Sequence, residues 1–446
     1  MLKNAIGISF AFVGVVVGAG FASGQEAMQY FVAFGEQGIW GAILGSVLML
    51  VGGISILQLG SYYQAKEHME VLGNISSKII AWVLDIATIV TLFSIGFVMF
   101  AGAGSNLNQQ FGIPLWIGAV IMLGLVIFFG MLDVRKVTRA IGVLTPFLLV
   151  FVIAGCTWTL MNADVSLSAL NANAANVSTT LPNWWISALN YTGLNFICVT
   201  SMAIVIGGSH LDTRSAGLGG FFGGLGYLMM LMLLTLGLMS RAETVAGDDM
   251  PLLSLINQLH PALGLAMSLV LFGMIFSTSL GMFYALGKRL SRGREGRFRV
   301  IFITACVIGF GLSFFGFQPL VAHVYPVLGY MGLLLIVVVL VAWLRGGQKL
   351  RREGKLRRRA HELVRRKLDP RERFTTEDKA ELASIAEASN VPEEELTESI
   401  AEEVGDKLSS DNDVDFDPEN PSGTVAYHSF SDPVRSKSHK PNTPTT

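Results

Sequence analysis

Charged residues are scarce in this chain of 446 residues, of which only 15% are Asp, Glu, Lys or Arg. Soluble domains usually carry about 25%, so the composition excludes an ordinary soluble protein. The charges are also unevenly distributed, because residues 1–345 carry 27 of them and residues 346–446 carry 38. The chain therefore has an apolar body and a highly charged tail. Its net charge of −1 excludes a globally basic nucleic-acid-binding protein, and no nucleic-acid partner is expected.

Cysteines and metal-binding motifs are equally scarce. The three cysteines, Cys156, Cys198 and Cys306, lie in apolar stretches, and an odd number at such positions argues against a disulfide framework. The motifs HExxH, CxxC and GxxxxGK[ST] are all absent, so the sequence offers neither a metal cluster nor a nucleotide site. No nucleophile–base pair stands in the apolar segments. An enzyme is therefore the least expected class, and no cofactor is expected beyond a coupling ion.

Hydrophobic residues make up 52% of the chain and form ten segments that can cross a bilayer, which requires about 20 apolar residues. The segments are 3–34, 37–62, 78–105, 113–132, 138–161, 184–207, 213–240, 261–287, 298–317 and 319–345. This pattern predicts an all-α polytopic membrane protein with ten transmembrane helices.

The distribution of Lys and Arg predicts the topology, because these residues accumulate on the cytoplasmic side of membrane proteins. If the N-terminus is cytoplasmic, the outer loops carry only Arg241, and the loop at 162–183 carries no basic residue. The inner loops then carry Lys66, Lys78, Arg135, Lys136, Arg139, Arg214, Lys288, Arg289, Arg292, Arg294, Arg297 and Arg299. We therefore expect a multi-pass protein of the cell membrane with both termini in the cytoplasm.

The ten segments divide into two blocks of five, 3–161 and 183–345. Because each block has an odd number of spans, the blocks must have opposite orientations, which makes them an inverted repeat. The first segment of each block is interrupted, by the glycine-rich stretch 14–24 and by the polar stretch 190–195. Interruptions at matching positions predict two broken helices around a binding site at the membrane midplane. The alternative is that the glycines only allow close helix packing, and for 190–195 both interpretations stay open.

A broken helix inside the membrane exposes carbonyl and N–H groups that lipid cannot satisfy, so these groups face a cavity or a ligand. Helix N-termini attract anionic groups, while free carbonyls attract cations. Two broken helices therefore suit a small zwitterionic or amine substrate that binds together with a cation such as Na⁺.

Two motifs resemble those of known transporters. Gly14-Val-Val-Val-Gly-Ala-Gly20 resembles the broken first helix of sodium-coupled transporters with the leucine-transporter fold, and Met274-Ile-Phe-Ser-Thr-Ser-Leu280 resembles the stretch that they use for sodium. Residues 17–26, VGAGFASGQE, are similar to the YkvI family of bacterial membrane proteins, which are regarded as amino-acid permeases. The resemblance covers about residues 1–345. It implies a leucine-transporter-like 5+5 inverted repeat with helices 1 and 6 broken, and Na⁺-coupled symport of an amino acid or related amine by alternating access.

The resemblance also implies a set of site residues. The implied sodium ligands are the carbonyls of Gly14, Val17 and Met274 and the hydroxyls of Ser277 and Thr278, five oxygens that suit a hard cation. The implied substrate-binding residues are Gly18, Ala19, Gly20, Phe21 and Ser23 near the first break, and Tyr191, Thr192, Gly193 and Asn195 near the second. After Gly20 the chain departs from the neurotransmitter-type pattern, which has an Asn and then an Arg there. For Ser277 and Thr278 the alternative is that the hydroxyls bond to their own helix backbone.

Glu26 and Asp85 are acidic residues within apolar segments, where a charge costs at least a few kcal/mol and usually faces a cavity or a partner. We expect one of them to gate the site or to carry a proton, so proton coupling is the alternative to sodium coupling. For Asp85 the competing interpretation is a salt bridge near the cytoplasmic face, with Arg135, Lys136 or Arg139 as the partner.

The tail begins with 11 basic residues between Arg345 and Lys367. Because they directly follow a span, they predict either a helix along anionic lipid or a simple stop-transfer anchor. Two short acidic helices are expected at 376–388 and 392–404, paired with each other or folded back on the basic stretch, so that 346–407 is a helical cytoplasmic segment. The composition of 408–446 predicts disorder. A non-transporting membrane sensor that signals through this tail is a further alternative.

Overall fold

The computed structural model describes residues 2–132, 144–163, 166–291, 295–369 and 371–409, and all regular elements in these ranges are helices. Seven of these helices are long and apolar enough to cross a membrane. They are α4 (Glu36–Tyr63), α6 (Lys78–Phe111), α9 (Leu144–Met161), α11 (Trp184–Gly208), α12 (Thr213–Met239), α15 (Pro261–Leu290) and α17 (Phe317–Leu368). Three shorter apolar helices are α1 (Leu2–Val16), α7 (Leu115–Gly130) and α16 (Phe298–Ser313). The predicted all-α membrane fold is confirmed, whereas the number of ten spans and the inverted relation of 3–161 to 183–345 stay predictions.

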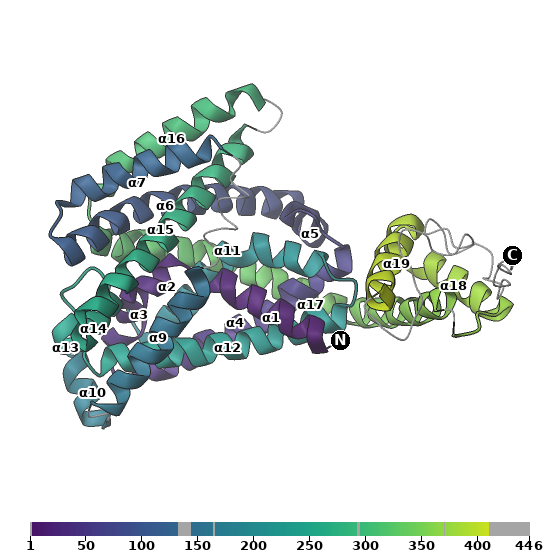
Figure 1. Ribbon diagram of the computed structural model, residues 1–446, viewed down its shortest axis with the longest axis horizontal. Helices are drawn as coiled ribbons and strands as arrows, with labels where there is room; N and C mark the ends of the chain where they lie inside the picture. Colours follow the sequence, from purple (N-terminus) through teal and green to yellow (C-terminus); the bar gives the residue numbers. More distant parts are fainter. Residues whose placement is uncertain (1, 133–143, 164–165, 292–294, 370, 410–446) are drawn as a thin grey trace, which may run out of the picture.

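Short helices lie at the two ends of the bundle. Figure 1 places α10 (Leu167–Ala174), α13 (Ala242–Val245) and α14 (Pro251–Leu259) at the end farthest from the tail. The chain begins at the opposite end, where Asn4 Nδ2 of α1 donates a hydrogen bond to Glu403 Oε1 of the tail (3.3 Å). The start of the chain and the tail therefore lie on the same side of the bundle.

The first span is broken, as its glycines predict. After α1 ends, the chain continues as α2 (Ala19–Ser23), α3 (Gln25–Tyr30) and the 3₁₀ turn η1 (Val32–Phe34). The N–H of Gly18 donates to Val16 O (3.0 Å) instead of the carbonyl four residues back, which interrupts the helical hydrogen bonds. A second break falls at Gly24, whose φ of +79° lies in the left-handed region that glycine adopts without strain.

The predicted break of the span at 184–207 is wrong, because α11 is a continuous helix of 25 residues. Its polar side chains bond within the helix instead of unwinding it. Thr192 Oγ1 donates to Ala188 O (2.8 Å), and Asn195 Nδ2 donates to Tyr191 O (3.0 Å). Gly193 serves close packing, since a Cβ built there would overlap the carbonyl oxygen of Gly329 in α17. The packing interpretation of this glycine is therefore the correct one.

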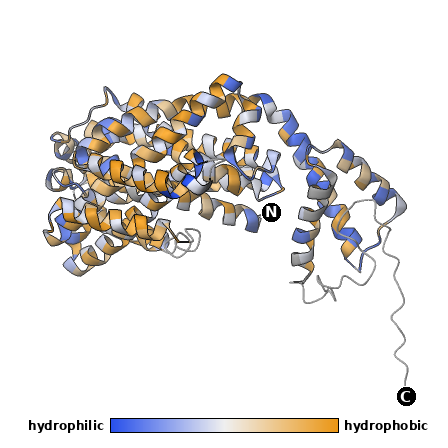
Figure 2. Cartoon of the chain, turned by 90° about the horizontal axis from the view of Figure 1, so that it is seen from above, coloured by the Kyte–Doolittle hydropathy of each residue, from blue (hydrophilic) through white to orange (hydrophobic). Residues whose placement is uncertain are grey.

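The last span continues without interruption into the tail. Figure 2 shows the change from hydrophobic to hydrophilic residues where α17 leaves the body. The helices α18 (Thr376–Ala388) and α19 (Glu393–Ser409) pack against the end of α17 around a separate apolar cluster, which includes Leu363, Leu382 and Leu396. The acidic helices thus fold back on the basic stretch. Residues 410–446, for which disorder is predicted, lie outside the described residues.

Arg357 of α17 fastens the tail to the body. Its side chain is only 2% exposed and donates five hydrogen bonds. The acceptors are Glu353 Oε1 (2.8 Å), Ser61 O (2.7 Å), Leu211 O (3.1 Å), Tyr62 O (2.7 Å) and Asn390 Oδ1 (2.9 Å). Because these acceptors belong to α4, to the α11–α12 loop and to the tail, one guanidinium joins three parts of the chain.

Replacing Arg357 with alanine is expected to release the tail. The change leaves the carboxylate of Glu353, which is 4% exposed, without its cation, and breaking a buried ion pair costs about 3–5 kcal/mol. Limited proteolysis should then cleave 369–409 much faster than in the unchanged protein. Arg352→Ala is the matched control because Arg352 is exposed on the same helix. Equal cleavage rates in the two variants would contradict this role of Arg357.

Acidification should destabilise α18 and its contact with α17. The backbone N–H of Thr375 donates to Asp378 (2.9 Å), and this bond holds the pKa of Asp378 below its usual value. The bond from Arg359 similarly lowers the pKa of Glu381. These two bonds therefore stabilise the folded tail fully at a pH above the unfolded-chain pKa values, which are 3.8 for Asp378 and 4.5 for Glu381. Their contribution is lost as the pH falls through the lower pKa values of the folded state. Hydrogen-exchange protection factors at 376–388, which correct for the pH dependence of intrinsic exchange, should fall as the pH drops below 4.5. Protection factors that are independent of pH would contradict this expectation.

Candidate functional site

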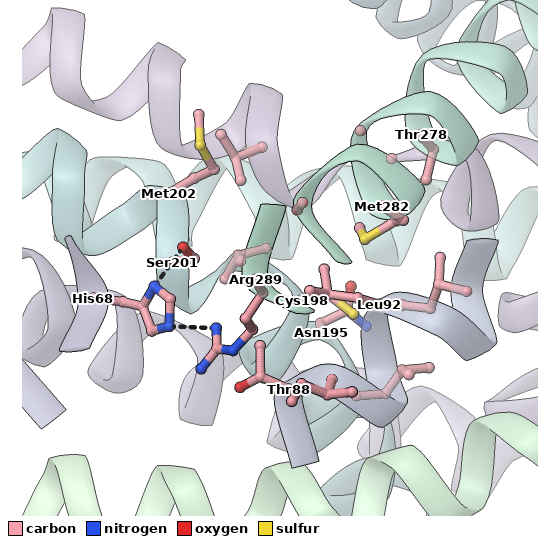
Figure 3. Close-up of a pocket in the computed structure, with 18 of the residues that line it drawn as sticks. His68, Thr88, Leu92, Asn195, Cys198, Ser201, Met202, Thr278, Met282 and Arg289 are labelled. Carbon is pink, nitrogen blue, oxygen red and sulfur yellow. Dashed lines mark hydrogen bonds between the residues drawn. The ribbon is translucent and has the colours of Figure 1, made fainter. Parts of the chain in front are cut away.

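A cavity of about 930 Å³ lies where the break in the first span meets α6, α11 and α15. It extends to the start of α5 (His68–Ile75), near the end of α15. Figure 3 shows side chains from several helices around this space, among them Asn195, Cys198 and Thr278. Eight of the residues singled out from the sequence line it: Gly18, Gly20, Phe21, Glu26, Asp85, Asn195, Ser277 and Thr278. The structure therefore brings both predicted groups, from the first span and from 274–280, to one space.

Other predicted residues are absent from the described lining of the cavity. Gly14 and Val17 flank the break in the first span, Ala19 begins α2, and Met274 is buried on α15. Ser23 is buried and its hydroxyl donates to Gly20 O (2.8 Å), so it supports the break from within. Tyr191, Thr192 and Gly193 are also absent from the described lining of the cavity.

Ser277 and Thr278 lie on α15 with hydroxyls that are free for a ligand. Among the described residues neither hydroxyl makes a hydrogen bond, whereas Thr88 Oγ1 on the facing helix α6 donates to Leu84 O (2.8 Å). The alternative, in which both hydroxyls bond to their own helix, is therefore not what the structure has. Two free hydroxyls beside an interrupted helix are suitable oxygen ligands for a cation.

Glu26 lies in the first turn of α3, and its carboxylate reaches back over the break. A Cβ built on Gly20 would overlap Glu26 Oε1, so the glycine provides the space for this side chain. Glu26 is 7% exposed and faces the cavity. The buried hydroxyl of Tyr191 lies beside Glu26 and Tyr227.

The other end of the cavity holds a polar network that the sequence did not predict. Arg289 of α15 forms a salt bridge with Asp85 of α6, and its Nη1 lies 2.8 Å from His68 Nε2. His68 Nδ1 lies 3.0 Å from the hydroxyl of Ser201 on α11 (Figure 3). The network thus joins α5, α6, α11 and α15 in the lining of the cavity.

The predicted salt bridge of Asp85 exists with a different partner. Arg135, Lys136 and Arg139 lie outside the described residues, and Asp85 pairs with Arg289. The apolar length of this span predicts an end at 287, which puts Arg289 among the inner-loop charges, whereas α15 extends to Leu290. His68 carried no sequence signal, since its role depends on how α5 folds back over the cavity.

Two proteins of Bacillus subtilis (strain 168) are similar to the chain in sequence. The uncharacterized membrane protein YkvI is 24% identical over 334 residues, which cover 75% of this chain and 94% of YkvI. The uncharacterized protein YyaD is 25% identical over 329 residues, which cover 74% of this chain and 94% of YyaD. No protein-family model matches the chain.

Among solved structures, the chain is similar to MhsT, whose crystal structure contains L-phenylalanine, with a TM-score of 0.51. The identity is 14%, and the match covers 76% of this chain and 98% of MhsT. The likeness shows that the chain is an integral membrane protein with the leucine-transporter fold. The similarity to YkvI agrees with the resemblance that residues 17–26 carry.

Proposed function

We propose that the chain is a secondary active transporter that carries an amino acid or a related small amine through the cavity of about 930 Å³. The observation that carries this proposal is the cavity itself, which joins a broken first span to the free hydroxyls of Ser277 and Thr278. Alternating access around such a site is the mechanism that a broken helix in the membrane suits. In this proposal the protein lies in the cell membrane with both termini in the cytoplasm.

Sodium is the proposed coupling ion. The hydroxyls of Ser277 and Thr278 would supply two ligands, and the carbonyls of Gly14, Val17 and Met274 would supply three. The broken helix supports this assignment, because the hydrogen bonds of an intact helix would occupy carbonyls at 14 and 17. The residues proposed for the substrate are the backbone at Gly18, Ala19 and Gly20, with Phe21 and Asn195 of the cavity lining around it. Ser23, Tyr191, Thr192 and Gly193 are not proposed as direct ligands, because they lie outside the described lining.

Thermal stability of the purified protein tests this function. A compound that binds the folded state raises stability by RT ln(1 + [L]/Kd), so even a millimolar ligand is detectable at saturation. The protein should be screened against amino acids and amines in Na⁺ and in K⁺ buffers. We expect at least one compound to stabilise the protein only in Na⁺. A screen without stabilising compounds in either buffer would contradict the substrate class.

Replacing Ser277 with alanine should remove the sodium dependence. The change deletes one of five proposed oxygen ligands but leaves the packing, because the hydroxyl makes no hydrogen bond in the described part of the chain. We expect the Na⁺ concentration for half-maximal stabilisation to rise at least tenfold. Ser279→Ala is the control: Ser279 lies two residues further on α15, and its hydroxyl donates to Gly96 O (3.3 Å), away from the cavity. An unchanged sodium dependence in the Ser277 variant would refute this sodium site.

Proton coupling is the second candidate, and the position of Glu26 favours it. A carboxyl group that is 7% exposed and faces the cavity is well placed to bind and release a proton. Asp85 is the weaker candidate because Arg289 neutralises it. Compounds that stabilise the protein equally in Na⁺ and K⁺, with an effect that depends on pH, would favour proton coupling.

A sensor without transport would bind the same compounds but show no uptake, and deletion of 346–446 would abolish its output.

A further inference from the structure

A second cavity, of about 600 Å³, lies where α17 leaves the apolar body and passes between the ends of α4 and α12. One wall is apolar and includes Ile54, Trp343 and Leu344. The wall nearer the tail is basic. Leu344 and Arg345 are neighbours in the sequence, so the cavity lies at the level where the membrane surface meets the tail.

Four basic side chains form the polar wall: Arg214 of α12, and Arg351, Lys355 and Arg358 of α17. The spacing of the three residues on α17 places them on one helix face. No acidic residue lines the described cavity. Arg358 forms an ion pair with Asp212 (3.3 Å), whereas the other three have no partner among the described residues. Three uncompensated positive charges therefore converge on one cavity.

The cavity is held open by fixed contacts around it. The indole N–H of Trp343 donates to Gln58 Oε1 (2.7 Å), and Gln58 Nε2 donates to Thr213 O (3.2 Å), which ties α17 to α4 and α12. Gly354 allows this close approach, because a Cβ there would overlap the hydroxyl of Thr213. A Cβ on Gly347, in contrast, would point into open space. These contacts fix the helices that carry the basic side chains relative to one another.

We propose that this cavity binds the phosphate group of an anionic phospholipid from the cytoplasmic leaflet. The guanidinium groups of Arg214 and Arg351 would donate paired hydrogen bonds to phosphate oxygens, with Lys355 as an additional cation. The acyl chains would lie along Ile54 and Leu344. The apolar wall favours a lipid over free phosphate, because free phosphate would make no contact with that wall. Basic pockets between spans at this level also suit acidic headgroups.

The test uses the full chain in neutral detergent, with phosphatidylglycerol as the probe and bound lipid counted by native mass spectrometry. The variant Arg214→Gln/Arg351→Gln/Lys355→Gln removes the three unpaired charges of the cavity. The control Arg345→Gln/Lys349→Gln/Arg352→Gln removes three charges of the same helix that do not line it. We expect the cavity variant to weaken phosphatidylglycerol binding at least tenfold, and the control to weaken it less than threefold. Equal losses in the two variants would overturn the proposal, because only nonspecific charge would then matter.

A second variant tests the shape of the cavity without changing charge. Gly347→Leu places a side chain in the open space and should exclude the lipid to the same extent while the protein stays folded. Unchanged lipid binding in Gly347→Leu would overturn the proposal.

Competition tests the source of the bound phosphate group: inorganic phosphate at millimolar concentration should not displace the lipid, and complete displacement would assign the cavity to free phosphate. Phosphatidylcholine should bind at least tenfold more weakly than phosphatidylglycerol, and equal binding would also overturn the proposal.

Discussion

Replacing Gly193 with alanine is expected to prevent α11 and α17 from packing and to destabilise the whole bundle. A Cβ at this position would overlap the carbonyl oxygen of Gly329 and would lie 2.9 Å from the backbone N of Leu333. Both obstacles are backbone atoms of a long helix, so neither can rotate away as a side chain would. Overpacking usually costs about 1–3 kcal/mol, and a backbone clash belongs at the upper end. The melting temperature of the purified protein should fall by several degrees, with a lower yield of folded protein.

Two further variants make this result specific. Gly332→Ala should have the same effect, because its Cβ would overlap the carbonyl oxygen of Gly193 from the other side of the contact. Gly311→Ala on α16 is the control, since its Cβ would meet no atom within 4 Å and alanine is the better helix former. If Gly193→Ala were as stable as Gly311→Ala but failed to bind substrate, the residue would act in the site and the packing account would be wrong.

Replacing Glu26 with glutamine is expected to reduce uptake at least tenfold. The amide has nearly the same size as the carboxylate but cannot carry the negative charge that faces the cavity beside Gly20. That charge would attract the amine of a substrate or the coupling cation, and it would titrate if protons drive transport. Initial uptake rates in proteoliposomes at several pH values measure the effect. Uptake that equals the unchanged protein at every pH would remove Glu26 from the mechanism.

The control for this change is Glu36→Gln, which removes the same charge from an exposed position at the start of α4. It should leave uptake unchanged. Gly20→Ala provides an independent route to the same defect, because its Cβ would displace the carboxylate of Glu26 without changing any charge. Gly281 also lines the cavity, but a Cβ there would meet no atom within 4 Å. The variant Gly281→Ala should therefore retain uptake. A Gly20 variant with full uptake would show that the position of Glu26 is unimportant.

The sequence predicts the membrane fold and the first break because both depend on local properties. Apolar length identifies the spans, and the glycines at 14, 18, 20 and 24 identify a helix that cannot stay continuous. The prediction for α11 failed because polar residues in a helix can bond to its own carbonyls. The sequence does not reveal whether Gly193 faces a ligand or a neighbouring helix, since that depends on the position of Gly329, far along the chain.

The same reasoning explains which parts of the site were found. Gly18, Gly20, Ser277 and Thr278 belong to short motifs, so their joint presence at one cavity follows from local patterns. The network of Asp85, Arg289 and His68 joins three helices that are distant in sequence, and no spacing rule predicts such pairs. The tail contact of Arg357 is likewise tertiary, because its acceptors come from separate segments of the chain.

Uptake into proteoliposomes tests the central claim most directly. The full chain should be reconstituted in liposomes loaded with K⁺, and a mixture of radiolabelled amino acids should be added outside with either Na⁺ or K⁺. The account predicts accumulation above the equilibrium level only with the inward Na⁺ gradient, and its loss in Ser277→Ala. Accumulation driven only by an imposed pH gradient would replace sodium with protons at Glu26. Binding of amino acids without accumulation under either gradient would contradict a transporter and would leave the cavity as the site of a sensor.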